Sequence, residues 1–192
     1  YAGLGNLVRD HLLFGYFYPA TTVDEPLLPR WENGHLHFGG WRMDGFDSRF
    51  LSSLASTAID RRVGSAEEGS LHEVEYLASS SLGGEPVLLV GHLFARECAE
   101  LRASGGDLVV RGRRLFAEVL PVVQIGGEQR YGFGRLLLER GETRQVEDLF
   151  GLPIDAGGPR PRVNVPEGRS FLAHTRVDGL EATGDVEPLV SR

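Results

Sequence analysis

A length of 192 residues, 41% of them hydrophobic, allows one domain or two small domains with a real core. The single cysteine, Cys98, excludes an internal disulfide framework and a multi-cysteine zinc site, and it predicts a reducing, cytoplasmic setting in which Cys98 is a small buried residue. No apolar run approaches the length of a membrane span, so no membrane partner is expected. The chain starts at Tyr1 without a signal-like segment, which suggests part of a longer polypeptide.

The net charge of −7 argues against a general nucleic-acid binder. The charges are unevenly placed, however, with five arginines and two glutamates between Arg111 and Arg135. All twenty basic residues are arginine. Coding bias explains this, yet arginine is also the side chain best suited to planar contacts with phosphates and bases. Charge therefore neither proves nor excludes binding to RNA.

The N-terminal region predicts a helix at Leu7–Leu13 that runs into the aromatic stretch Phe14–Pro19. The segment 21–47 is rich in proline and aromatic residues and is typical of an inserted loop, with one strand at His35–Phe38. Two histidines on one face of that strand can suit a metal. No third ligand is nearby, so exposed strand histidines are the preferred interpretation.

Phe50–Ser56 leads into a charged segment in which Asp60 can orient Arg61 or Arg62 towards a phosphate. A surface salt bridge without function explains the same residues. The composition of Gly64–Gly69 predicts a flexible linker.

Leu71–Leu77 and Pro86–Phe94 are predicted strands, and the Ser79–Gly84 loop between them predicts an antiparallel pair. His72 and His92 would lie on these strands. A lone histidine is usually structural, although a general base is conceivable because its pKa lies near neutrality.

Further along, the pattern predicts a helix at Arg96–Ala103 and a strand at Asp107–Arg111. Leu115–Gln124 has apolar residues at helical spacing, apart from Pro121, and Leu136–Leu138 is typical of a short buried strand. The predicted order is therefore helix, loop, strand.

The loop itself is the most informative stretch, and we call Gly126–Arg135 the glycine loop. It contains four glycines, two arginines and two aromatic residues: Gly126, Gly127, Gly132, Gly134, Arg130, Arg135, Tyr131 and Phe133. A dinucleotide fingerprint needs the order strand, glycine turn, helix, and a phosphate P-loop needs a lysine, which this chain lacks. Glycine amides, guanidinium groups and aromatic rings together suit a single-stranded RNA backbone. A glycine-rich turn with two solvated arginines is the alternative.

Three segments resemble the RAMP (repeat-associated mysterious protein) superfamily of CRISPR effector complexes. The glycine loop is similar to that family's C-terminal glycine-rich loop. Thr57–Glu75, which contains Ile59-Asp60-Arg61, resembles the central motif of the type III members. Leu13-Phe14-Gly15 resembles the end of their first helix. The early Pro-Gly-Ser-type segment is absent, and no strand precedes the helix.

The resemblance implies an α+β fold: a modified RRM-like, ferredoxin-like domain with an antiparallel sheet, its first strand missing, and irregular insertions. The RAMP-like RNA-binding domain would cover 1–150, with 21–47 as an insertion. The segment 151–192 would be an irregular extension, proline- and glycine-rich at Asp155–Arg169 and with a last strand at Phe171–Val177. The hairpin around Gly64–Gly69 would project as a thumb that displaces a base of the guide–target duplex.

The implied function is that of a guide-RNA-binding subunit of a type III CRISPR interference complex, with guide RNA, target RNA and other effector subunits as partners. Base pairing would supply the sequence specificity. The glycine loop, together with Arg61 and Arg62, would contact RNA. Enzymatic activity stays open: Asp10 is the candidate for Mg²⁺-dependent cleavage of target RNA, with a helix-surface charge as its alternative. No other cofactor or metal site is predicted. A protein–protein interaction domain without RNA contact is the hypothesis from another class.

Overall fold

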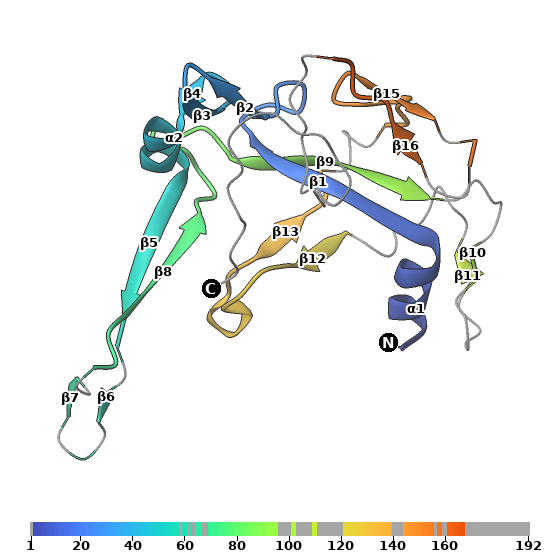
Figure 1. Ribbon diagram of the computed structural model, residues 1–192. Coiled ribbons are helices and arrows are strands. Elements are labelled where there is room, and N and C mark those ends of the chain that lie inside the picture. The colour runs from blue at the N-terminus through green and yellow to red at the C-terminus, as the bar shows by residue number, and fades with distance from the viewer. Residues whose placement is uncertain are drawn as a thin grey trace, which may run out of the picture.

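A computed structural model gives the three-dimensional arrangement (Figure 1). It describes residues 2–57, 59–60, 62, 64–66, 69–95, 101–102, 109–110, 121–139, 144–155, 157–158 and 161–167. Within these residues the chain is mostly β, with two α-helices and several small antiparallel sheets. The helical share is smaller than an α+β fold leads one to expect.

A long two-stranded ladder crosses the middle of the molecule (Figure 1). Helix α1 (Ala2–His11) runs directly into strand β1 (Leu12–Ala20), which pairs antiparallel with β9 (Leu88–Ala95). The helix predicted up to Leu13 is thus confirmed as far as His11. Beyond it, aromatic residues favour the extended backbone of a strand.

The proline-rich segment after β1 is not an irregular loop but a three-stranded meander followed by a helix. Its elements are β2 (Pro29–Glu32), β3 (His35–Phe38), β4 (Trp41–Arg42) and α2 (Met43–Phe50). The strand predicted at His35–Phe38 is confirmed. Asn33 and Gly34, with φ of 51° and 76°, form the two-residue turn between β2 and β3. Positive φ at both positions matches the twist of the flanking strands.

Residues 51–77 form a hairpin that we call the arm. Strand β5 (Leu51–Ser56) pairs with β8 (His72–Leu77), and the short strands β6 (Ile59–Asp60) and β7 (Ser65–Ala66) pair at its far end. Figure 1 shows the arm projecting away from the β1–β9 ladder. The expectation that the chain forms a projecting hairpin here agrees with this shape.

The two strands on either side of the Ser79–Gly84 loop are confirmed, but the prediction that they pair with each other is wrong. Strand β8 pairs with β5, and β9 pairs with β1. Between them only Ser80 and Pro86 form an isolated bridge. Each strand has its own partner because the chain turns sharply at this point, away from the arm and into the ladder.

Two further short hairpins correct the helix predictions. Strand β10 (Leu101–Arg102) pairs with β11 (Val109–Val110), and β12 (Val122–Gln124) pairs with β13 (Arg135–Leu137). The helix predicted at 96–103 is therefore wrong at 101–102, and its other residues lie outside the described residues. The helix predicted at 115–124 is wrong at 122–124, and 115–120 lie outside the described residues. Pro121 and two β-branched valines favour a strand at 122–124. The strand predicted at 136–138 is confirmed at 136–137, but it is not buried, since Leu137 is 68% exposed.

The end of the described chain is a small sheet rather than a wholly irregular segment. It contains β14 (Asp148–Leu149), β15 (Leu152–Asp155) and β16 (Arg162–Val163), in that order. The predicted last strand at 171–177 and Cys98 lie outside the described residues. No helix in the described part of the chain is long and apolar enough to cross a membrane.

Two aromatic clusters hold these sheets together. Phe46 of α2 lies between Phe38 of β3 and Phe50, with ring centres 4.7 and 5.0 Å apart. Phe150, in the β14–β15 turn, packs edge-on against Tyr18 of β1 at 5.2 Å and His92 of β9 at 4.4 Å. The second cluster fixes the β14–β16 sheet to the central ladder, and Phe150 adopts a φ of 52° to take part in it.

Candidate nucleic-acid interface

The glycine loop forms the tip of the β12–β13 hairpin. Gln124 and Arg135 are the last residue pair of the ladder, and the amide of Ile125 donates to the carbonyl of Gly134 at 2.9 Å. Inside the loop, Gln129–Tyr131 make one 3₁₀ turn. Gly134 has a φ of 75°, and a Cβ there would collide with the carbonyl of Ile125. The tight closure of the loop therefore requires glycine at this position.

Two glutamine side chains donate hydrogen bonds to carbonyl groups of the loop. The amide group of Gln124 donates to the carbonyls of Gln129 at 3.1 Å and Phe133 at 3.2 Å. The side chain of Gln129 donates to the carbonyl of Gly126 at 3.0 Å. Among the described residues, none accepts a hydrogen bond from the backbone N–H of Gly126, Gly127 or Glu128. These carbonyl groups thus accept hydrogen bonds from side chains of the hairpin, while the three backbone N–H groups can donate to a ligand.

Both arginines of the loop are exposed. Neither Arg130 nor Arg135 forms an ion pair with another described residue. Glu128 is exposed in the same loop, so the loop carries a net positive charge of one. A guanidinium group without an ion pair can bind a phosphate without first losing a protein partner.

The two aromatic residues of the loop have different environments. Tyr131 is 71% exposed, so both its ring and its hydroxyl are open to a ligand. Phe133 is half-buried and packs against Tyr76 of the arm, with ring centres 4.8 Å apart and planes inclined at 55°. Tyr131 is therefore the stacking candidate, and Phe133 joins the loop to the arm.

The remaining predicted RNA contacts lie elsewhere. Arg62 is exposed between β6 and β7, at the far end of the arm, which Figure 1 places away from the β12–β13 hairpin. Arg61 and the acidic residues Glu67 and Glu68 lie outside the described residues. The structure thus brings Arg130, Arg135 and Tyr131 together and leaves Arg62 apart from them.

Asp10, the candidate for metal-dependent cleavage, lies on α1 and pairs with Arg9, the Nε–Oδ1 distance being 3.0 Å. No cluster of three or more histidine, cysteine, aspartate or glutamate side chains suited to a metal occurs in the described part of the chain. His35 and His37 both lie on β3, as expected, but the prediction that both are exposed is confirmed for His35 and wrong for His37, which is half-buried with its Nδ1 lacking a hydrogen-bond partner among the described residues. A catalytic role for Asp10 stays a prediction.

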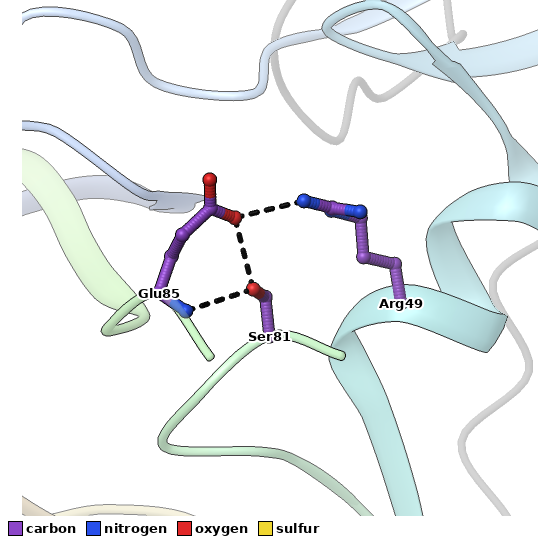
Figure 2. A network of polar contacts seen from close by, with 3 residues as sticks. All are labelled: Arg49, Ser81 and Glu85. Atoms are coloured by element: carbon purple, nitrogen blue, oxygen red, sulfur yellow. Dashed lines mark hydrogen bonds and ion pairs between the residues drawn. The ribbon is translucent and has the colours of Figure 1, made fainter. Parts of the chain in front are cut away.

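Sequence reasoning missed a polar network at the root of the arm (Figure 2). Arg49 of α2 contacts Glu85, Nη2 to Oε2, at 2.8 Å, and the Ser81 hydroxyl donates to the same oxygen at 2.9 Å. The Glu85 amide donates back to the Ser81 hydroxyl at 3.2 Å, and the Arg49 guanidinium lies 4.7 Å from the ring centre of Trp41. The Ser81 hydrogen bond and, after it, Arg49 lower the pKa of Glu85. Together these contacts fix the turn between the arm and β9.

His72 and His92 have structural environments. His72 is exposed, and its Nδ1 lies 3.2 Å from the carbonyl of Ser70. His92 is half-buried against Phe150, and its Nδ1 has no hydrogen-bond partner among the described residues. Burial lowers the pKa of His92, and the nearby charge of Asp148 acts in the opposite direction. Packing against Phe150 accounts for the position of His92, whereas His72 stays on the exposed surface of β8, and a general-base role for either histidine stays a prediction.

A cavity of about 330 Å³ lies at the junction of β3, β4 and α2, away from the glycine loop. Its lining residues are His35, Leu36, Arg42, Met43, Asp44 and Asp47. Arg42 and Asp44 pair with each other across it, Nε to Oδ1, at 3.3 Å. Asp47 also lines the cavity, and its Oδ1 is buried without a hydrogen-bond partner among the described residues.

Comparison with protein-family models, with curated proteins and with solved structures finds no match to this chain.

Proposed function

We propose that this chain is an RNA-binding subunit of a type III CRISPR effector complex, and that its glycine loop grips the backbone of the guide RNA. One observation carries the proposal: an exposed loop presents amide donors and two arginines that have no hydrogen-bond acceptor or ion-pair partner among the described residues, together with an exposed tyrosine ring, on one hairpin tip. The RRM-like fold of the RAMP superfamily and the cytoplasmic setting belong to the same proposal.

Each group has a distinct task in this binding mode. The guanidinium groups of Arg130 and Arg135 pair with phosphate oxygens, because their planar forks match that geometry. The amides of Gly126 and Gly127 donate to the same chain where no side chain keeps it away. Tyr131 stacks on a base, which is tolerant of sequence because every base has a flat face. Sequence recognition is left to base pairing with the target.

The form of the arm supports the same proposal. A two-stranded ribbon has no core of its own and is marginal unless something packs on it. Leu54, Ile59 and Leu71 are large apolar residues that stay exposed on this ribbon. Apolar side chains on a projecting hairpin suit the displacement of a base, which is the task of the thumb in the family that the sequence resembles.

A salt titration of RNA binding tests the proposal. Replacing both Arg130 and Arg135 by alanine should weaken the binding of single-stranded RNA of any sequence and reduce the salt slope of log K by about 1.4, since each phosphate contact on a single strand contributes about 0.7. The matched control replaces Arg30 and Arg144, two exposed arginines on other elements that pair with Glu32 and Asp24. The same loss of charge there should leave the slope unchanged, and equal effects of the two double variants would reject the loop as the binding site.

A protein-interaction surface is the second candidate function, favoured by the aromatic residues along β1. Phe14 is 55% and Phe17 42% exposed there, and exposed aromatics are enriched at interfaces. The two functions differ in what co-purifies with the chain, RNA or protein alone. An effector subunit needs both surfaces, since it must also contact its neighbours.

Cleavage of target RNA by Asp10 with Mg²⁺ stays a separate prediction. A cleavage assay with the Asp10→Ala variant as control decides whether the chain holds RNA or also cuts it. The loop experiment is independent of this result, because the binding groups of the loop include no residue of α1.

A further inference from the structure

The two faces of the arm differ in charge. Side chains alternate between the faces along each strand, and residues directly opposite in the β5–β8 register share a face. One face, here called the acidic face, carries the pairs Ser53–Glu75 and Ala55–Glu73. The other, here called the neutral face, carries the pairs Ser52–Tyr76, Leu54–Val74 and Ser56–His72. Both carboxylates of β8 thus lie on one side of the ribbon.

The glycine loop meets the neutral face. Its Phe133 packs against Tyr76, which projects from that face at the root of the arm, opposite Ser52. The carbonyl of Phe133 is held at the same time by Gln124. Because Phe133 is fixed at both its ring and its backbone, the loop adjoins the neutral face at Tyr76, and the acidic face lies on the other side of the ribbon.

Charge then decides on which side of the arm a polyanion can continue. On the acidic face a phosphate would approach Glu73 and Glu75, and one like charge at about 4 Å in water lowers affinity about 5-fold. On the neutral face it meets hydroxyl donors from Ser52 and Ser56. The apolar side chain of Leu54, 48% exposed, can contact a ribose or a base.

We propose that the RNA strand held by the glycine loop continues along the neutral face of the arm, from Tyr76 towards His72. This path rests on the proposed function, because it requires that the loop binds RNA. It goes further in assigning one side of the arm to the RNA and in naming Ser52, Leu54 and Ser56 as residues that face it.

The experiment places the same charge on opposite sides of one strand. Leu54→Glu and Ala55→Glu are adjacent exposed positions of β5 on the neutral and acidic faces. Fluorescence anisotropy with the full 192-residue chain uses two oligouridines, a short one that spans only the loop and a longer one that reaches the arm. Leu54→Glu should weaken binding of the longer RNA about 5-fold and leave the short one unchanged. Ala55→Glu should change neither.

A second pair of variants adds a positive charge instead of a negative one and leaves the apolar side chain of Leu54 in place. Ser52→Arg should tighten binding of the longer RNA, whereas Ser53→Arg, opposite Glu75, should leave it unchanged. Thermal unfolding tests whether each variant is folded. If Leu54→Glu does not fold, the comparison of Ser52→Arg with Ser53→Arg decides the question.

Equal effects on the two faces, or a larger effect at Ala55 and Ser53, would overturn the path and leave the proposed function intact. The same conclusion follows if the longer RNA binds no more tightly than the short one. Wild-type protein that binds neither RNA would instead overturn the proposed function, and the path with it.

Discussion

The ring of Tyr76 rests against the ring of Phe133, their centres 4.8 Å apart. This contact joins two segments that lie far apart in the sequence. Tyr76 belongs to the arm and Phe133 to the glycine loop, which are the two parts of the chain for which we propose contact with RNA. The two parts therefore meet at an aromatic contact.

The first prediction concerns the strength of this pair. Tyr76→Ala and Phe133→Ala should each lower the free energy of unfolding, and the double variant should lose less than the sum, with a coupling of about 0.5–1.5 kcal/mol. Denaturant unfolding of the four proteins measures it. Tyr131→Ala, in the same loop but 71% exposed, should stay within about 0.5 kcal/mol of the wild type. Strict additivity would mean that the rings do not support one another.

Two glycines of the loop should separate folding from binding. A Cβ at Gly134 would collide with the Ile125 carbonyl, and its φ of 75° is unfavourable for alanine, so Gly134→Ala should cost more than about 2 kcal/mol. Gly127 has no neighbouring atom within 4 Å of such a Cβ. Gly127→Ala should therefore leave the unfolding transition unchanged while weakening RNA binding several-fold, because a methyl group would keep the RNA backbone away. Unchanged RNA affinity would remove Gly127 from the binding surface.

The side chain of Gln124 should control the rigidity of the loop. It donates to two loop carbonyls, so Gln124→Ala should lower stability by about 1 kcal/mol and speed amide hydrogen exchange at Gln129–Phe133. Gln145→Ala is the matched control, because this exposed glutamine lies outside the hairpin. If exchange in the loop were equally fast in both variants, the two hydrogen bonds would not be what orders it.

Acid should loosen the turn at the root of the arm through Glu85. Its pKa is lowered by the Ser81 hydroxyl and by Arg49, so the carboxylate stabilises the folded state above the ordinary carboxyl pKa of 4.5. This contribution is lost as the pH falls through the lower folded pKa. Glu85→Gln should lack this part of the acid dependence in thermal unfolding. An identical pH profile in the two proteins would show that the network does not respond to the charge of Glu85.

His92 should make the fold sensitive to mild acid. Burial lowers its pKa below the ordinary value of 6.5, so the unfolded chain takes up this proton first as the pH falls from neutrality. Stability should therefore decrease through this range, and His92→Phe should flatten the decrease. Asp148→Asn should steepen it, because the charge of Asp148 raises the pKa of His92. Thermal midpoints measured between neutral and mildly acidic pH provide the check.

Local patterns predicted the strands well where apolar residues run together or alternate with polar ones. Leu88–Ala95 is an example of the first pattern and His72–Leu77 of the second, and both favour an extended backbone whatever they pair with. Their partners depend on contacts between distant segments, and periodicity does not contain that information. The helix expected up to Gln124 is wrong at Val122–Gln124 for a local reason, because Pro121 and the valines that follow it oppose a helix. The dipeptide Asn33-Gly34 is typical of a two-residue hairpin turn, and it indicates the β2–β3 hairpin from the sequence.

The candidate site was predictable in its composition but not in its contacts. The glycines and arginines of the loop suffice to expect an exposed turn with free donors. That Phe133 faces Tyr76 while Tyr131 faces solvent is decided by tertiary packing, and no spacing in the sequence distinguishes the two rings. The Arg49–Glu85 contact likewise joins residues from separate elements.

The strict alternation of side chains along the arm limits how its length can vary. Adding or removing two residues in each strand keeps Leu54 and Tyr76 on one side of the ribbon and Glu75 on the other. A change of one residue on one strand would exchange the sides beyond that point and turn carboxylates towards the loop. Longer or shorter versions of this hairpin should therefore differ by even steps, which gives a designer a simple rule for grafting it onto another scaffold.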